Sequence, residues 1–361
     1  MKKKIIISVS SDLATDQRVQ KVAKTCHENN FDVLLVGRKL KNSFPVNFPY
    51  NYKRLNLIFN SGFLFYAELN IRLFFLLLFS SSDILLSNDT DTLLPNYFVS
   101  KIRNKKLIFD THELFPEVPE LADRPFVKKV WEKIEDFIFP KLKNAYTVSQ
   151  SIATYYGKKY GIEMKVIRNV PYHSYLNNTT KDKQGKTIIY QGAINKGRGL
   201  EWVIQAMPKI DGTLIVAGDG DIKHELEKLV NSLGLSEKVF FIGKKTPCEL
   251  KEITLKADLG LCLLEDLGLS YYYSLPNRIF DYIQAEIPVL AMDFPEIRNI
   301  VDTYKTGVLI NQYDAEFLAK TINNIFDNGF DTSHFYKLAQ ELNWENEERV
   351  LLEILNSIQE H

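Results

Sequence analysis

The sequence predicts an α/β protein with two parallel-sheet domains, and three observations support this. Short apolar runs alternate with helix-length amphipathic segments, the runs fall into two sets, and a polar stretch separates the sets. Buried runs joined by helices favour parallel sheets made of βαβ units. Two such sets predict two Rossmann-like, doubly wound domains. A length of 361 residues also suits two cores better than one.

The apolar runs are the predicted strands. In the first half they are Lys4–Val9, Asp32–Gly37, Asp83–Ser87, Lys106–Asp110, Ala145–Ser149 and Lys165–Arg168. In the second half they are Thr187–Gln191, Thr213–Ala217, Val239–Ile242, Leu259–Leu263, Pro288–Met292 and Gly307–Ile310.

The domain boundary follows from composition. Residues 171–186 (PYHSYLNNTTKDKQGK) are polar, carry no periodic apolar pattern and precede a clean strand, so they predict a linker between domains at 1–170 and 187–342. Residues 343–361 form a charged amphipathic segment with no strand after it. We expect this segment to be a helix that packs back on the first domain.

Bulk composition narrows the class of protein. Lys plus Arg and Asp plus Glu number 45 each, so no overall charge favours nucleic acid and any anion site must be local. The cysteines Cys26, Cys248 and Cys262 share no short spacing. This predicts neither a disulfide framework nor a zinc site, and it suits a reducing cytoplasm. The apolar run near the N-terminus is too short for a signal sequence and predicts a first strand.

The segment Phe63–Phe79 is strongly apolar but is interrupted by Glu68, Asn70 and Arg72. Two charges in so short a run predict against a transmembrane span. Two interpretations remain, a buried or half-buried helix and a helix that lies on a membrane surface.

A glycine-containing loop follows the first strand of the second domain. It holds Gly192, Gly197 and Gly199 together with the cations Lys196 and Arg198, and a helix follows it. Free backbone N–H groups and two cations suit a diphosphate. The alternative is a tight turn with solvated basic residues.

Two further strands of this domain end in glycine, at Gly218 and Gly243. Each is a weak signal by itself, although backbone groups at such an edge can bind a base.

The segment Leu267–Leu290 carries more information. Ser274 is placed to cap a helix with Pro276 near its first position. The exposed backbone amides of the segment Leu275–Arg278, in which Pro276 itself has no N–H, would then point at an anion. Asp281 lies one turn after Asn277 on the same face, where a carboxylate can accept hydrogen bonds from ribose hydroxyls. The alternative is a capped helix with a surface Asp.

From Ile188 to Val301 the chain resembles the donor domain of the large retaining glycosyltransferase family four, the glycosyl transferases group one. That family has the GT-B fold, in which two Rossmann-like domains face a cleft. Leu275-Pro276-Asn277-Arg278 is similar to a branch found in bacterial polysaccharide and glycolipid assembly. The chain departs from the family pattern at Ala193, where the family carries an arginine, and at Tyr273, where it carries the first of two glutamates. Arg198 replaces the usual lysine, and Asp281 replaces the second glutamate.

The resemblance makes the first domain the acceptor side. There Asp16 and Arg18 resemble the Asp-x-Arg that opens the first helix in many members, and Arg18 could reach a phosphate or be a helix surface charge. Asn88 and Asp89 end a strand and predict either a polar loop at the cleft or an N-cap cluster.

His112 and Glu113 follow the next strand of the first domain. A lone histidine is more often structural, but the resemblance implies that His112 hydrogen-bonds the transferred sugar. Its charge state would then be set by Asp110 or Glu113.

The resemblance implies transfer of a sugar from a UDP- or GDP-sugar to a saccharide or lipid-linked acceptor with retention, with His112 and Arg198 as the catalytic residues. It implies that no cofactor and no metal are needed. We expect a cytoplasmic protein, with the membrane surface as a further partner through Phe63–Phe79. The alternatives are a sugar-nucleotide 2-epimerase and an inactive nucleotide-sugar-binding protein.

Overall fold

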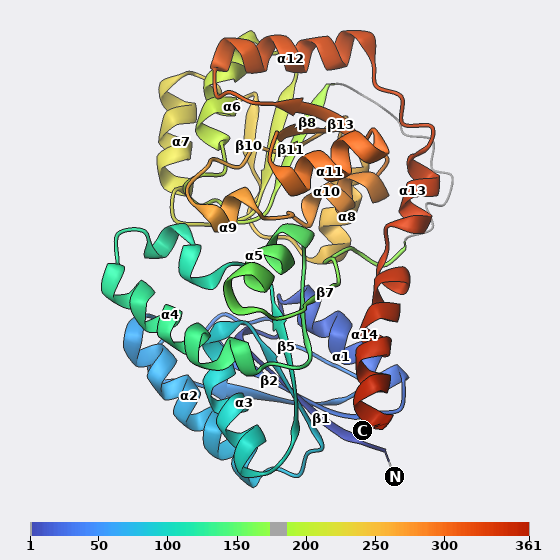
Figure 1. Cartoon of the computed structure of the whole chain (residues 1–361). Helices are drawn as coiled ribbons and strands as arrows, with labels where there is room; N and C mark the ends of the chain where they lie inside the picture. Colours follow the sequence, from blue (N-terminus) through green and yellow to red (C-terminus); the bar gives the residue numbers. More distant parts are fainter. Residues whose placement is uncertain (1, 174–185, 361) are drawn as a thin grey trace. The chain divides into compact units, whose positions relative to one another are not determined.

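The computed structural model describes residues 2–173 and 186–360, and the chain divides into two compact units. Unit 1 comprises Met1–Asn169 and Glu347–His361, and unit 2 comprises Val170–Asn346 (Figure 1). Most of the predicted linker, residues 174–185, lies outside the described residues.

Unit 1 is built on a parallel sheet with the strand order β3-β2-β1-β4-β5-β6-β7. The six strands predicted in the first half are all present, whereas β3 was not predicted. In β3 only Leu55 is buried, because the strand lies at the edge of the sheet and pairs with β2 alone, so its sequence lacks an apolar pattern. The strands are β1 (Lys4–Asp12), β2 (Asp32–Lys39), β3 (Asn51–Asn56), β4 (Ile84–Asn88), β5 (Lys106–Thr111), β6 (Ala145–Thr147) and β7 (Lys165–Val166).

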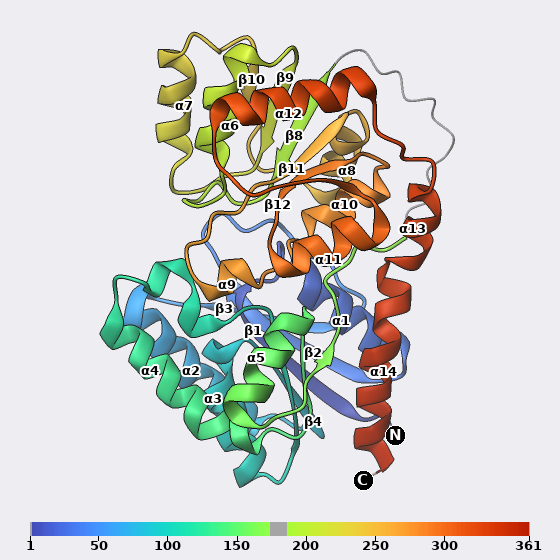
Figure 2. The ribbon, with the colours of Figure 1, turned by 45° about the horizontal axis from the view of Figure 1, so that its top comes forward.

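Helices cover both faces of this sheet. The helices of unit 1 are α1 (Gln17–Glu28), α2 (Gly62–Phe79), α3 (Thr90–Ile102), α4 (Pro125–Ile138), α5 (Gln150–Tyr160) and most of α14 (Trp344–Glu360). Apolar residues of α2 and α3 share one core cluster with strand residues such as Ile6 and Leu85. In both views α1 and α14 lie side by side (Figures 1 and 2).

Helix α2 is half-buried, as one interpretation of its sequence predicted. Phe65, Leu69, Leu73 and Leu77 form a stripe at four-residue spacing that packs in the core of unit 1. The opposite face is also apolar but exposed, and it includes Phe63 and Phe75. By length and composition α2 could cross a membrane, and no other helix of the described residues could.

The C-terminal helix α14 packs on unit 1 through both apolar and polar contacts. Leu351 and Leu355 are fully buried. Glu347 accepts hydrogen bonds from the backbone N–H of Arg168 at 2.8 Å and from its Nε at 2.7 Å, and Glu348 accepts one from Thr25 at 2.6 Å. The end of the chain is therefore part of the first unit.

Unit 2 repeats the architecture with the strand order β10-β9-β8-β11-β12-β13, and its six strands are those predicted. They are β8 (Thr187–Gln191), β9 (Thr213–Ala217), β10 (Val239–Phe241), β11 (Leu259–Cys262), β12 (Val289–Met292) and β13 (Gly307–Ile310). The helices are α6 (Leu200–Ala206), α7 (Lys223–Ser232), α8 (Pro247–Leu255), α9 (Leu269–Tyr272), α10 (Arg278–Gln284), α11 (Pro295–Tyr304), α12 (Ala315–Asn328) and α13 (Phe335–Glu341).

The predicted fold class, two doubly wound parallel sheets, is confirmed. In each sheet the direction of winding reverses at one point, between β1 and β4 in unit 1 and between β8 and β11 in unit 2. Ligands of doubly wound proteins bind at the carboxyl ends of the strands beside such a switch point. The functional groups of each unit are therefore expected at this position.

Candidate functional site

At the switch point of unit 2, the loop 192–199 leaves β8 and leads into α6. A side chain on Gly199 would place its Cβ 2.5 Å from the carbonyl oxygen of Leu263, and one on Gly218 would collide with the carbonyl of Gly192. Both glycines also have positive φ angles. The loop is thus pressed between the end of β11 and the turn after β9, which fixes its backbone.

Two arginines lie at this loop, Arg198 within it and Arg278 on α10 beside Gly192. The Arg278 guanidinium lies 4.4 Å from the centre of the Tyr190 ring, and the Arg198 guanidinium lies 4.6 Å from the centre of the Tyr271 ring. Neither arginine forms an ion pair with any described residue. Burial raises the pKa of the Cys262 thiol to about 11 although both arginines oppose that rise, so both positive charges act on the same point. Lys196, in contrast, is exposed.

The start of α10 differs from the prediction. The helix begins at Arg278 with Asn277 as its N-cap, and Ser274 is too far upstream to cap it. The Ser274 hydroxyl donates instead to the carbonyl of Tyr271 at 2.8 Å. Among the described residues, the backbone N–H groups of Leu275, Asn277 and Arg278 find no acceptor, so the predicted anion-binding amides remain available.

The side chain of Asp281, on α10, reaches the end of β8, where its Oδ2 accepts a hydrogen bond of 2.7 Å from the side-chain Nε2 of Gln191. The side-chain Oε1 of Gln191 in turn accepts a hydrogen bond from the Thr254 hydroxyl at 2.8 Å. This chain orients the carboxylate. Gln191 was not singled out in the sequence, although its place as the last residue of a central strand was a usable signal.

The remaining predicted donor positions lie around the same loop. The N–H of Gly218 donates to the carbonyl of Gly243 at 3.0 Å, so the turns after β9 and β10 touch. Leu275 is buried, and Ala193 is exposed beside Gly192. The structure therefore brings most of the predicted donor residues to one edge of the sheet.

The switch point of unit 1 has a different character. Arg18 is buried and donates two hydrogen bonds to the Asp110 carboxylate, from Nε at 2.9 Å and from Nη2 at 2.8 Å. Its Nη1 donates to the carbonyl of Ile167 at 2.9 Å. The interpretation of Arg18 as a helix surface charge is wrong, because the first helix presents it to the sheet. With all three nitrogens engaged, Arg18 positions Asp110.

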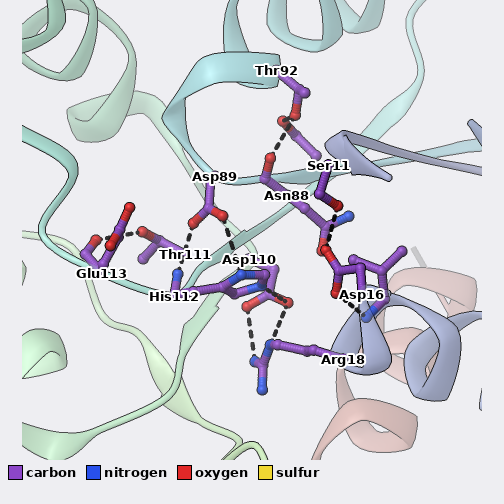
Figure 3. A network of polar contacts seen from close by, with 12 residues as sticks. Ser11, Asp16, Arg18, Asn88, Asp89, Thr92, Asp110, Thr111, His112 and Glu113 are labelled. Atoms are coloured by element: carbon purple, nitrogen blue, oxygen red, sulfur yellow. Dashed lines mark hydrogen bonds and ion pairs between the residues drawn. The ribbon is translucent and has the colours of Figure 1, made fainter. Parts of the chain in front are cut away.

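His112 is held between two carboxylates (Figure 3). Its Nδ1 lies 3.1 Å from Asp89 and its Nε2 lies 3.0 Å from Asp110. Burial opposes the positive charge, but the two carboxylates outweigh it and hold the pKa of His112 well above its ordinary value. Asp110 was foreseen as a partner of His112, whereas Asp89 was not.

Asp89 and Asp16 have specific structural roles. Asp89 has a positive φ of 57°, which is strained for a residue with a side chain, and it also accepts a hydrogen bond from the backbone N–H of His112 at 2.8 Å. Asp16 is the N-cap of α1 and accepts from the N–H of Val19 at 3.1 Å. Asn88 is fully buried and donates to the carbonyl of Ser8 at 3.0 Å, so it joins β4 to β1.

Two acids beside this pair are shifted towards their neutral forms. Burial, together with Asp89 and Glu120, raises the pKa of Glu113 to about 8. Burial and Asp89 likewise raise the pKa of Asp91 to about 7. The net charge at this switch point is consequently small at neutral pH.

Two parallel-sheet Rossmann-like units of this kind define the GT-B architecture, and solved structures agree. Sucrose-phosphate synthase from Thermosynechococcus elongatus is similar with a TM-score of 0.79 and 16% identity, covering 99% of each chain. HepE from Anabaena, in complex with UDP-glucose, is similar with a TM-score of 0.74 and 15% identity, covering 99% of this chain and 100% of that one.

Residues 174–343 match the family model described as glycosyl transferases group 1. An uncharacterized glycosyltransferase of Methanocaldococcus jannaschii is 37% identical over 150 residues, which are 40% of this chain and 37% of the relative. In the other curated relatives that it matches, the chain also spans less than two thirds of their length.

Proposed function

We propose that the protein transfers a sugar from a nucleoside diphosphate sugar, a UDP- or GDP-sugar, to a hydroxyl of a saccharide or a lipid-linked acceptor, with retention of anomeric configuration. The observation that carries the proposal is the switch point of unit 2. There Arg198, Arg278 and the backbone amides at the start of α10 lie around one loop, neither arginine forms an ion pair with a described residue, and Asp281 lies one turn after Arg278. Such a site favours a ligand that carries both a diphosphate and a ribose.

The comparisons support this choice of donor. HepE, which shares the fold, has been solved with UDP and glucose and with UDP-glucose. In our proposal Asp281 accepts the ribose hydroxyls, since Gln191 already orients its carboxylate. The Arg198 guanidinium and the backbone amides of Asn277 and Arg278 hold the diphosphate.

The proposed reaction breaks the bond between the anomeric carbon and the diphosphate oxygen and forms a bond from the acceptor oxygen to that carbon on the same face. The departing diphosphate oxygen takes the proton of the acceptor hydroxyl. The protein then acts by positioning the reactants and by stabilising the charge that develops on the leaving diphosphate. Arg198 has this second role.

His112 needs a more specific role than the sequence suggested, because both of its ring nitrogens are engaged. A sugar hydroxyl can bind the ring by displacing one carboxylate. Asp89 is the candidate for displacement, since its side chain is 19% exposed whereas that of Asp110 is fully buried. We propose that the charged His112 donates from Nδ1 to a sugar hydroxyl in this way.

The donor assignment is tested by the thermal stability of the protein with UDP, GDP and their common sugar conjugates. We expect at least one to raise the melting temperature of the wild type, and Asp281→Ala to lower that response. Asp302→Ala, an exposed aspartate of α11, is the matched control. If no nucleotide stabilises the wild type, or if Asp281→Ala responds equally, the donor assignment is wrong.

Product analysis separates the competing functions. A transferase hydrolyses the donor slowly without acceptor and consumes it quickly with one. A 2-epimerase produces the epimeric nucleotide sugar and no transfer. A binding protein shows the thermal shift without any turnover. We further propose that the protein cations make a metal unnecessary, so an excess of EDTA should leave the transfer rate unchanged.

We also propose that unit 1 contacts an anionic membrane through a surface formed by α2 and α4. The two helices touch through Tyr66 and Trp131, whose ring centres are 5.1 Å apart. Exposed apolar side chains lie on both helices, and lysines of α4 lie among them, a combination typical of membrane interfaces. The residues of this α2–α4 surface are Phe63, Ile71, Phe75, Phe79, Phe126 and Val130, with Lys128, Lys129 and Lys133.

This contact would place a cytoplasmic protein on the inner face of the cell membrane, where a lipid-linked acceptor is within reach. We expect the protein to co-sediment with vesicles that contain anionic lipid and Phe126→Glu to weaken that binding, because the Phe126 side chain is 80% exposed. Phe44→Glu, at an exposed phenylalanine in a loop of unit 1, is the control. Equal binding by all three proteins would remove the α2–α4 surface from consideration.

A further inference from the structure

Arg278 is a buried cation that forms no ion pair with any residue that the structure describes. The residue is 9% exposed, and the groups that act most strongly on its charge are Tyr190, Cys262 and Tyr282, none of which is a carboxylate. A buried guanidinium is costly to maintain unless a negative group compensates it. The nearest acid along α10, Asp281, is bonded to Gln191. The structure thus leaves the counter-charge of Arg278 to a ligand.

The guanidinium lies directly against the loop 192–199 that leaves β8. A Cβ atom on Gly192 would lie 2.9 Å from the Arg278 Nη2, and Gly192 itself is exposed. The exposed Gly192 therefore lies directly against this cation. The Tyr190 ring, at 4.4 Å, covers the guanidinium and fixes its plane, and the Tyr190 hydroxyl donates to the carbonyl of Ala193 at 2.5 Å. The arginine and the loop are held as one assembly.

The position matters because of Ala193. In the family pattern an arginine follows the glycine at this place in the loop, and here a methyl group stands instead. We propose that Arg278 supplies the missing cation from a different element, α10, and binds the diphosphate of the donor with its planar fork. This inference rests on the proposed function for the identity of the donor, but not for the presence of an anion site.

The experiment measures the affinity of the full chain for UDP, inorganic pyrophosphate and uridine by calorimetry. We expect Arg278→Gln to lower the affinity for UDP and for pyrophosphate by at least about tenfold, because one bidentate charged contact is lost. The affinity for uridine should change by less than about twofold. Arg298→Gln is the matched control, since Arg298 lies on the surface of α11 in an ion pair with Asp293. It should leave all three affinities unchanged.

Two further variants separate a role in binding from a role in folding. Arg278→Lys keeps the charge without the fork and should weaken pyrophosphate by about three- to tenfold. If Arg278→Gln does not fold, this variant decides, and an unchanged affinity would overturn the inference. Ala193→Arg introduced into Arg278→Gln restores the cation at the family position, and it should recover UDP affinity at least in part. A residue needed only for packing would not be rescued in this way.

The outcomes distinguish this inference from the proposed function. If the wild type binds UDP and Arg278→Gln binds it equally well, the role of Arg278 is refuted while the donor assignment stands. If the wild type binds pyrophosphate but no nucleotide, and Arg278→Gln loses pyrophosphate, the donor assignment fails and the cation role stands. If the wild type binds neither UDP nor pyrophosphate, both fail.

Discussion

The two switch points have the same strand order but opposite electrostatic design. In unit 1, Arg18 is paired with Asp110, and His112 is paired with both Asp89 and Asp110. In unit 2, Arg198 and Arg278 rest on aromatic rings and form no ion pair with described residues. The fold therefore does not set the charge of the site, which depends on a few side chains at the strand ends.

This difference indicates what each unit can bind. A site whose charges are compensated internally is rigid and nearly neutral, so it suits an uncharged ligand such as a sugar hydroxyl. In a site whose cations have no internal counter-charge, the positive charge is neutralised only when an anion binds. Variants that break the internal pairing of unit 1, or block the open site of unit 2, test this comparison.

The largest effect is expected from Asp110→Ala. This change leaves Arg18 buried without its bidentate partner and removes one of the two carboxylates that hold His112. Removing one partner of a buried ion pair destabilises a protein by about 3–5 kcal/mol. We expect a loss of this size in the free energy of unfolding of unit 1, measured by urea denaturation.

The control for this experiment is Asp123→Ala, which removes an exposed aspartate of the same unit. It should change the free energy of unfolding by less than about 0.5 kcal/mol. A small effect of Asp110→Ala would mean that the charges of unit 1 are not mutually dependent, and the contrast with unit 2 would lose its basis.

A second test uses the buried acid Glu135, which ties α4 to α5. Its carboxylate accepts hydrogen bonds from Tyr156 at 3.0 Å and from Tyr160 at 3.2 Å. Burial raises its pKa from an ordinary 4.5 to about 7, although Lys159 and the two hydroxyls oppose the rise. A raised folded-state pKa means that stability is complete below about pH 4.5 and is lost as the pH rises through about 7.

Unit 1 should therefore become less stable between pH 5 and pH 8, and Glu135→Gln should reduce this loss by about 3 kcal/mol, since each pKa unit corresponds to about 1.4 kcal/mol. The amide cannot ionise but keeps polar contacts with the tyrosines. Glu132→Gln on the same helix should retain the pH dependence of the wild type. An identical slope in Glu135→Gln and the wild type would show that Glu135 is not neutral in the folded protein.

Much of the fold could be predicted because buried parallel strands appear in the sequence as short apolar runs. All twelve predicted strands exist within one to three residues of their expected ends. The missed strand β3 (Asn51–Asn56) shows the limit, since an edge strand with one buried residue has no such run. The start of α10 was misplaced for a related reason: Ser274 has the chemistry of a cap, but its hydroxyl is taken by the preceding turn.

The candidate site was less predictable than the fold. Glycines and charges at strand ends pointed to the right loops, because those loops are continuous in sequence. Asp110 was foreseen as a partner of His112, but the more distant partners were not visible, since Arg18 meets Asp110 across 92 positions and His112 meets Asp89 across 23. The position of the Arg278 guanidinium under Gly192 is likewise a result of tertiary packing. Whether a cation is compensated is therefore learned only from the structure.

The open site of unit 2 can be blocked by Gly192→Ala. The added methyl group would collide with the Arg278 guanidinium, and the φ of +133° disfavours any side chain. We expect donor affinity to fall by about tenfold or more, which is about 1.4 kcal/mol, in a titration with UDP. Gly234→Ala is the control, because that glycine also has a positive φ but faces open space. If both variants bind UDP as the wild type does, the loop does not contact the ligand.

The smallest effect is expected from Lys196→Ala, although Lys196 lies in the same loop as Arg198. Its side chain is exposed, so water already solvates its charge and salt screens it. The Arg198 guanidinium is held on the Tyr271 ring, and its Nε is buried without a partner. We expect Lys196→Ala to lower the affinity for UDP by less than about threefold in dilute buffer, and by still less at about 0.5 M salt. Arg198→Ala should lower the same affinity by about tenfold at either salt concentration. Equal losses in the two variants would show that the anion site depends on the number of cations in the loop, and not on the burial that distinguishes unit 2 from a solvated basic surface.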